Sequence, residues 1–132
     1  MTVPDSFEIS TILPASAQQV YEAWLSSDKH GAMTGGGARI DPVIGGQFNA
    51  WDGYITGTTL ELEPYRRIVQ SWRTAEFPAD APHSRLEILL AEEAAGTRLT
   101  LKHSNIPAGQ GSNYESGWAS NYFDPMKDYF AE

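Results

Sequence analysis

The chain has 132 residues, with 17 acidic and 9 basic side chains and a formal net charge of −8. This length predicts one domain, residues 1–132, that is large enough to bury a core of its own. The absence of cysteine excludes disulfides, thiolate metal sites and a cysteine nucleophile. The acidity disfavours a nucleic-acid partner, because the phosphate backbone carries charge of the same sign.

No stretch of about 18 consecutive apolar residues occurs, so no membrane span is expected. The first ten residues lack the basic and apolar regions of a signal peptide. We therefore expect a cytoplasmic protein.

The first elements are a strand and two short helices. Residues 7–13 are rich in β-branched and apolar side chains, which is typical of a strand. Ser16 and Gln19 have the spacing of a capping box and predict the start of a helix. Ser26 and Ser27 are alternative caps of a second short helix, which is expected to end near Met33 because the glycines at 35–37 break it.

Five further strands follow from the apolar patterns. They are expected over residues 46–51, 54–63, 68–73, 86–90 and 99–103. Leu60 and Leu62 are predicted to share one face of their strand, and Glu61 and Glu63 to form the solvated one. Gly96-Thr97 predicts the turn of a hairpin between the last two strands.

The last segment, from about Ser112, has the period of a helix, and Trp118 and Tyr122 begin an aromatic stripe along it. Pro125 conflicts with an uninterrupted helix, because it lacks an N–H and clashes with the preceding turn. Two alternatives remain open: a kink at this point, which we favour, or a new helical turn with Asp124 as its cap and Pro125 at its first position.

This order of elements predicts an α+β fold. A curved antiparallel sheet would wrap around the long C-terminal helix, with the two short helices following the first strand. Such an arrangement leaves a cavity between helix and sheet wherever side chains do not fill it.

Short motifs carry a family resemblance over nearly the whole chain, from about Phe7 to Phe130. They are Pro14-Ala15 with Val20-Tyr21, Gly45-Gly46-Gln47-Phe48, Gly57 followed by Leu60-Glu61-Leu62-Glu63-Pro64, Ile68-Val69 with Trp72-Arg73, Gly96-Thr97 with Leu99, Ile106-Pro107-Ala108, and Gly117-Trp118 with Tyr122-Phe123 and Lys127. In order and spacing the chain resembles the START-like (SRPBCC, helix-grip) superfamily. Within it, the chain is similar to the C-terminal domain of the activator of the heat-shock-protein-90 ATPase, and thus to the second half of the eukaryotic protein only.

The aromatic stripe of the last helix has two explanations. Aromatic residues at helical spacing often form an ordinary core. The resemblance favours a ligand cavity, because related proteins bind lipids, hormones or polyketides between helix and sheet. The candidate ligand-binding residues are Phe48, Trp72, Leu86, Ile88, Leu101, His103, Trp118, Tyr122 and Met126. His103 is the polar candidate, since it shares the face of Leu99 and Leu101.

Three functions follow from the resemblance. The first is a non-enzymatic domain, a monomer or dimer, that binds a small hydrophobic molecule. The second is a co-chaperone-like module that binds a chaperone or another protein. The third, a cyclase- or hydrolase-like enzyme, requires at least two polar groups that converge in the pocket. No HExxH or GxSxG motif occurs, so we expect no metal, no cofactor and no catalytic residue.

Overall fold

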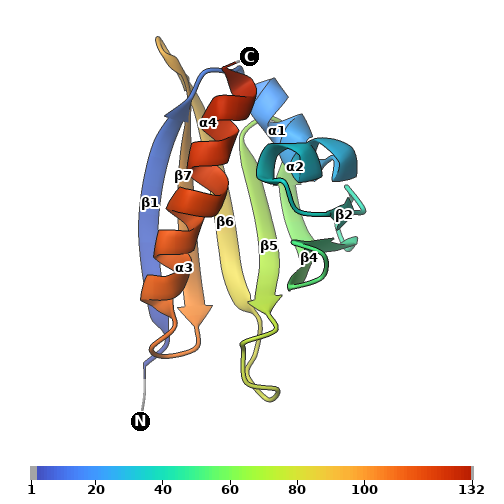
Figure 1. Ribbon diagram of the computed structural model, residues 1–132, viewed down its shortest axis with the longest axis vertical. Helices are drawn as coiled ribbons and strands as arrows, with labels where there is room; N and C mark the ends of the chain where they lie inside the picture. Colours follow the sequence, from blue (N-terminus) through green and yellow to red (C-terminus); the bar gives the residue numbers. More distant parts are fainter. Residues whose placement is uncertain (1–2, 132) are drawn as a thin grey trace.

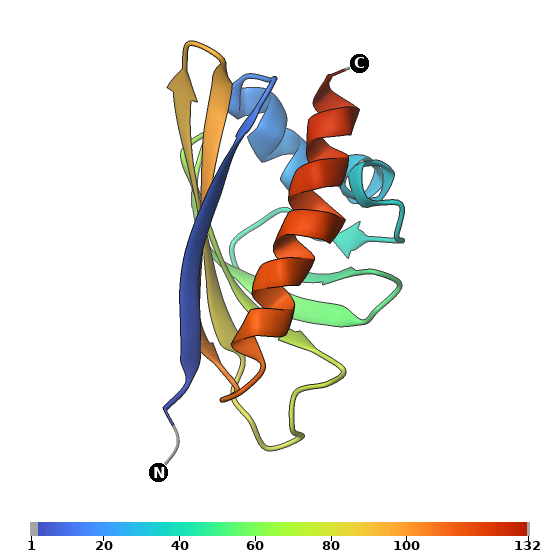
Figure 2. The same cartoon turned by 60° about the vertical axis from the view of Figure 1, so that its left-hand side comes forward.

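The computed structural model describes residues 3–131, in which a curved antiparallel sheet wraps around a long C-terminal helix (Figures 1 and 2). Seven strands lie in the order β1-β7-β6-β5-β4-β3-β2. Their bounds are β1 Asp5–Leu13, β2 Arg39–Ile40, β3 Gln47–Ala50, β4 Ile55–Glu63, β5 Arg67–Thr74, β6 Ser84–Glu93 and β7 Gly96–Ile106. The expected strands are all present, and the two-residue β2 adds one that the patterns did not indicate.

The helices lie on the concave side of the sheet (Figure 2). They are α1 Ala17–Leu25, α2 Ser27–Thr34, α3 Gly111–Trp118, the π-helical turn η1 Ala119–Phe123 and α4 Asp124–Phe130. The fold is the expected α+β helix-grip arrangement. Its core lies between sheet and helices, where Leu86, Ile88, Leu101 and Met126 are all completely or almost completely buried.

Both short helices begin where the sequence predicts. At the start of α1, the Ser16 hydroxyl accepts a hydrogen bond from the Gln19 N–H at 3.1 Å, and the Ser16 N–H donates to the Gln19 side chain at 2.9 Å. The predicted capping box is therefore confirmed. The C-terminal helix is held at its start by the first strand, because Asp5 Oδ2 accepts from the N–H groups of Gly109 and Gly111.

The predicted alternation along β4 is wrong at Leu60. Thr59 pairs with Gln70 and Glu61 with Val69, so Leu60 is an extra, unpaired residue in a bulge and is 44% exposed. The solvated side of β4 is confirmed, because Glu61 and Glu63 are both accessible and both contact Arg67.

The β6–β7 hairpin turns two residues earlier than expected. Residues 94–95 form the turn, and Gly96 is already the first residue of β7, paired with Glu93. Gly96 has φ of +138°, and a Cβ there would lie 2.0 Å from the carbonyl oxygen of Leu13. The glycine therefore serves a close approach to β1 and not the turn itself.

Pro125 neither kinks the last helix nor follows a cap. The chain passes through η1 and into α4 as one continuous ribbon without a sharp bend (Figures 1 and 2). Asp124 has helical dihedral angles and is the first residue of α4, so it is not a cap, whereas Pro125 does lie in the first turn of a new α-helical segment. The widened turn before it relieves the conflict between proline and a continuous α-helix.

Candidate ligand-binding cleft

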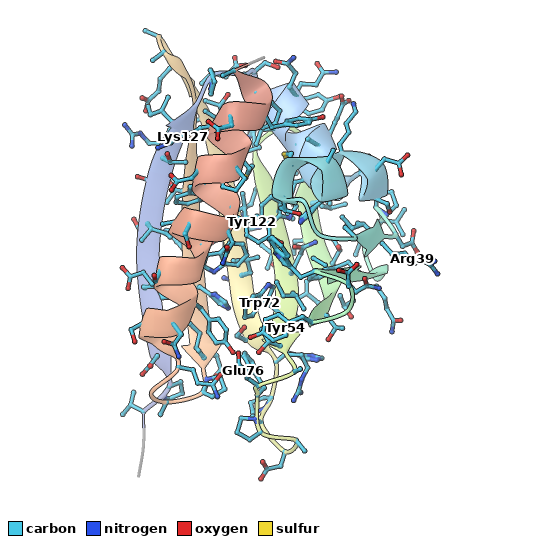
Figure 3. All side chains as sticks on the ribbon, in the orientation of Figure 1. Arg39, Tyr54, Trp72, Glu76, Tyr122 and Lys127 are labelled. Atoms are coloured by element: carbon cyan, nitrogen blue, oxygen red, sulfur yellow. The ribbon has the colours of Figure 1, made fainter. Side chains whose placement is uncertain are left out.

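A cleft of about 550 Å³ lies between the C-terminal helix and the strands β4 and β5. Six aromatic side chains supply most of its lining: Trp51, Tyr54, Trp72, Tyr114, Trp118 and Tyr122. Figure 3 shows Tyr122, Trp72, Tyr54 and Glu76 along the space between helix and sheet. Ile55 and Gly117 complete the apolar part. Because Gly117 has no side chain, the helix leaves space in the cleft at this position.

The lining rings come from different elements and pack directly on one another. Trp72 of β5 lies 5.0 Å from Tyr114 of α3 and 5.6 Å from Trp118, measured between ring centroids. Trp118 in turn lies 4.6 Å from Tyr122, and Trp51, from the turn after β3, lies 6.4 Å from Tyr122. These contacts hold the walls of the cleft in place without a ligand.

Polar side chains also line the cleft, with Glu76 at one end of it (Figure 3). These side chains are Glu76, Asn113 and Asn121. The hydroxyl of Tyr54 donates to the Glu76 carboxylate. Burial, together with this hydrogen bond, raises the pKa of Tyr54 to about 12, so this phenol is neutral at physiological pH.

A second hydrogen-bonded chain fixes Tyr114 beside this end. Its hydroxyl donates to Gln110 Oε1 at 2.8 Å and accepts from the Thr74 hydroxyl at 2.7 Å. The Thr74 oxygen also accepts from the N–H of Glu76 at 3.1 Å. Helix α3 and the end of β5 are thereby linked at the point where Glu76 enters the cleft.

His103 is completely buried and both of its ring nitrogens are engaged. Trp118 Nε1–H donates to His103 Nδ1 at 3.1 Å, so the proton of the neutral ring is on Nε2, which donates to the Ser84 hydroxyl at 2.7 Å. Ser84 donates in turn to the carbonyl of Trp72 at 2.9 Å. Burial lowers the pKa of His103 to about 3. His103, the predicted polar ligand contact, thus has both ring nitrogens satisfied by hydrogen bonds within the protein.

His30 is a second buried histidine, which the sequence patterns did not single out. Its Nδ1 lies 2.8 Å from the carbonyl oxygen of Trp24 and therefore carries the proton, so Nε2 accepts from the Tyr122 hydroxyl at 3.0 Å. Burial lowers the pKa of His30 and raises that of Tyr122. Because 92 residues separate the two partners, no local pattern could have indicated the contact.

Only part of the predicted site lines the cleft. Trp72, Trp118 and Tyr122 do. Phe48 and Leu86 border, with those three, a separate void of about 10 Å³ that is too small for an organic ligand. Ile88, Leu101, Met126 and His103 are core residues and line neither space.

None of the other eight lining residues was among the predicted site residues. Tyr114, Gly117 and Asn121 succeed one another at spacings of three and four, and Tyr114 and Asn121 lie four residues before and three after Trp118, a signal that could have found them. Trp51 and Tyr54 lie in an irregular turn, for which no periodic signal exists. Among residues 3–131, no group of three or more histidine, aspartate or glutamate side chains is arranged to hold a metal ion.

Solved structures share this fold over nearly the whole chain. An HSP90 activator from Plasmodium falciparum superposes with a TM-score of 0.85 at 23% identity, over 96% of both chains. The Aha1 dimer from Colwellia psychrerythraea superposes with a TM-score of 0.80 at 15% identity, also over 96% of both chains. At these identities the likeness concerns the fold alone.

Sequence comparison identifies the family. The human activator of 90 kDa heat shock protein ATPase homolog 1 is 25% identical over 115 residues, which are 87% of this chain and 34% of the human protein. The chain thus spans about a third of the length of this relative. The family described as "Activator of Hsp90 ATPase homolog 1-like protein" matches residues 14–131. The chain therefore belongs to the activator of Hsp90 ATPase homolog 1-like family, within the START-like helix-grip superfamily.

Proposed function

We propose that this protein binds a small hydrophobic molecule in the cleft beside its C-terminal helix. The observation that carries the proposal is the cleft itself: about 550 Å³, lined mainly by aromatic rings, with a few polar side chains among them. Small-molecule sites commonly have this size and composition. The walls are packed before any ligand arrives, so binding does not require the core to rearrange.

Three of the predicted contact residues, Trp72, Trp118 and Tyr122, stay in the proposal as the inner wall. Trp51, Tyr54 and Tyr114 are the other lining aromatic residues. Tyr114 is buried beside Trp72, whereas the more accessible rings of Trp51 and Tyr54 would cover a planar ligand from the solvent side. Because Trp51, Trp72 and Trp118 all line the cleft, an occupying ligand changes the environment of three of the four tryptophans.

Binding without catalysis is the form of the proposal that the side chains support. A hydrolase- or cyclase-like reaction uses a group that can take up or give up a proton near neutral pH. His30 and His103 have both ring nitrogens engaged and lowered pKa values. Tyr54 stays protonated, because burial raises its pKa to about 12.

The test is a titration of the protein with a library of small aromatic and aliphatic compounds, followed through tryptophan fluorescence and the indole N–H signals in NMR spectra. The substitution Gly117→Leu places a large side chain in the cleft from a helical position. Ser116→Leu is the matched control, because Ser116 borders a different groove, between α3 and β1.

We expect compounds that shift the indole signals of the unchanged protein to lose this effect in Gly117→Leu and to keep it in Ser116→Leu. A library without any compound that binds up to millimolar concentration would contradict the proposal. Equal binding to both variants would place the site elsewhere.

A co-chaperone role is the second candidate, and family membership is the observation that favours it. The relative with which it shares 25% identity is named an activator of the 90 kDa heat shock protein ATPase. Stimulation of that chaperone's ATPase by the purified chain would support the role. The absence of both stimulation and binding at high micromolar concentration would count against it.

A further inference from the structure

We propose that the molecule which the cleft selects is an organic cation, an amine or quaternary ammonium compound with an apolar body. The inference rests on the proposed ligand binding and adds the chemical class of the ligand. It is carried by the combination of aromatic walls with one carboxylate, Glu76, which lies beside Tyr54 in the lining of the cleft.

The aromatic walls supply the first attraction. An aromatic ring is negative over its face, and a cation within about 6 Å of the ring centre is attracted to it, most strongly over tryptophan. Three of the lining residues are tryptophans. Two pairs of lining rings stand nearly perpendicular, Trp72 with Tyr114 at 82° and Trp51 with Tyr122 at 78°. Rings at right angles can turn their faces to one space from two directions.

Glu76 supplies the second attraction. Its carboxylate accepts from the Tyr54 hydroxyl, which is neutral and leaves the negative charge uncompensated. Among the ion pairs of residues 3–131, none joins Glu76 to a lysine or arginine. A ligand ammonium group near the end of the cleft would be the partner that this carboxylate lacks.

No basic side chain borders the cleft within the described part of the chain. Arg73 precedes Thr74 on β5 and is the cation nearest in sequence to Glu76. Its guanidinium donates to the carbonyl oxygens of Pro78 and Ala81 and lies over the Phe77 ring, so it is bound to the following loop. With a net charge of −8, the protein also repels anionic ligands at long range.

The experiment compares three probes of similar shape and different charge. Naphthylmethyl-trimethylammonium is the cation, neopentylnaphthalene is its neutral isostere, and naphthylacetate is the anion. Affinities are measured by NMR titration of the full chain at low and at physiological salt. We expect the cation to bind about tenfold more tightly than the neutral isostere, and the anion to bind most weakly. Physiological salt should reduce the difference in affinity between the cation and the neutral isostere, because Glu76 is exposed and its charge is screened.

Two variants locate the effect. Glu76→Gln should reduce the ratio of cation to neutral affinity about threefold or more. Glu115→Gln removes the same charge from α3, where the side chain borders the groove toward β1, and should leave the ratio unchanged. Equal affinity for the cation and the neutral isostere, or a ratio unaffected by Glu76→Gln, would overturn this inference while ligand binding stands. Failure of all three probes, together with failure of the compound library, would overturn both.

Discussion

The indole N–H of Trp118 donates to Nδ1 of His103, and this one contact joins a wall of the cleft to the buried centre of the sheet. The contact fixes the neutral tautomer of the histidine, since the indole nitrogen can only donate. Protonation of His103 would bring its Nδ1–H against the indole N–H of Trp118, so that two buried donors would face each other. The histidine is therefore a structural group that positions Trp118.

Acid should destabilise the protein through this histidine. The pKa of His103 is lowered from 6.5 to about 3 on folding, so the unfolded chain binds more protons below about pH 6.5. The contribution of His103 to stability is complete above that pH and is lost as the pH falls toward about 3. Between about pH 7 and pH 5 we expect a loss of about 2 kcal/mol from this residue.

Urea unfolding at the two pH values measures this loss. His103→Gln should reduce the pH dependence, whereas His83→Gln, which removes an exposed histidine, is the control. A free energy of unfolding that is the same at both pH values would refute the assignment.

Tyr122→Phe should destabilise the protein by about 1 to 3 kcal/mol. The hydroxyl of Tyr122 is the donor to His30 Nε2, and its removal leaves a buried acceptor without a partner. Thermal and chemical denaturation measure the effect. Tyr54→Phe removes a hydroxyl from the accessible end of the cleft and should change stability by less than about 0.5 kcal/mol. Similar losses in the two variants would argue against a special role for the His30 contact.

Gly57→Ala should cost about 3 kcal/mol or more. A Cβ at Gly57 would lie 1.9 Å from the carbonyl oxygen of Ser71 and 2.7 Å from the ring of Phe48, so both backbone and core would have to move. Gly117→Ala is the matched comparison. Its nearest neighbour would be Asn121 at 3.7 Å, and the helix should gain about 0.5 to 1 kcal/mol. A change in denaturation midpoint of the same sign and size in Gly57→Ala and Gly117→Ala would contradict the steric argument.

Arg67→Met should lower the denaturation midpoint, most strongly at low salt. Arg67 contacts Glu87 at 2.6 Å, Glu61 at 2.7 Å and Glu63 at 3.2 Å, so its removal leaves three carboxylates facing one another. Its hydrogen bond holds the pKa of Glu87 below the usual 4.5. The stabilisation from this carboxylate is present above that pH and is lost as the pH falls through the lowered value.

Arg66→Met is the control for that experiment, because Arg66 forms one exposed pair with Glu63. The difference between the two variants should shrink in high salt and below about pH 4. A salt-independent difference would instead indicate that the aliphatic part of Arg67 carries the effect.

Local patterns predicted the fold well. The two-residue period of the strands, the capping box of Ser16 and the period of the last helix all depend on neighbours within a few residues. The wrong predictions concern residues whose positions depend on contacts with distant parts of the chain. Leu60 leaves its expected face because of a bulge against β5, and Gly96 is required by its approach to Leu13.

The cleft was harder to predict for the same reason. Trp51 has φ of +52° in the turn after β3, an unusual conformation for a non-glycine residue that no alternation indicates. The predicted residues Ile88 and Leu101 of the sheet and Met126 of the helix lie in the core between these elements, where packing fills the space. What remains open is the region nearer the β3–β4 turn, where Gly117 has no side chain to fill the space.

The π turn of residues 119–123 joins α3 to α4 and adds one residue to an otherwise continuous helix. An α-helix advances about 100° per residue, and the wider π turn takes up one residue without that advance, so the residues after it keep the faces that they would have one position earlier. Gly117 and Trp118 therefore face the cleft, while Met126 beyond the turn is still aimed into the core. In a regular α-helix over the same residues, Met126 would be turned by about 100° from its buried position. The extra residue thus allows one continuous helix to present Gly117 and Trp118 to the cleft and Met126 to the core.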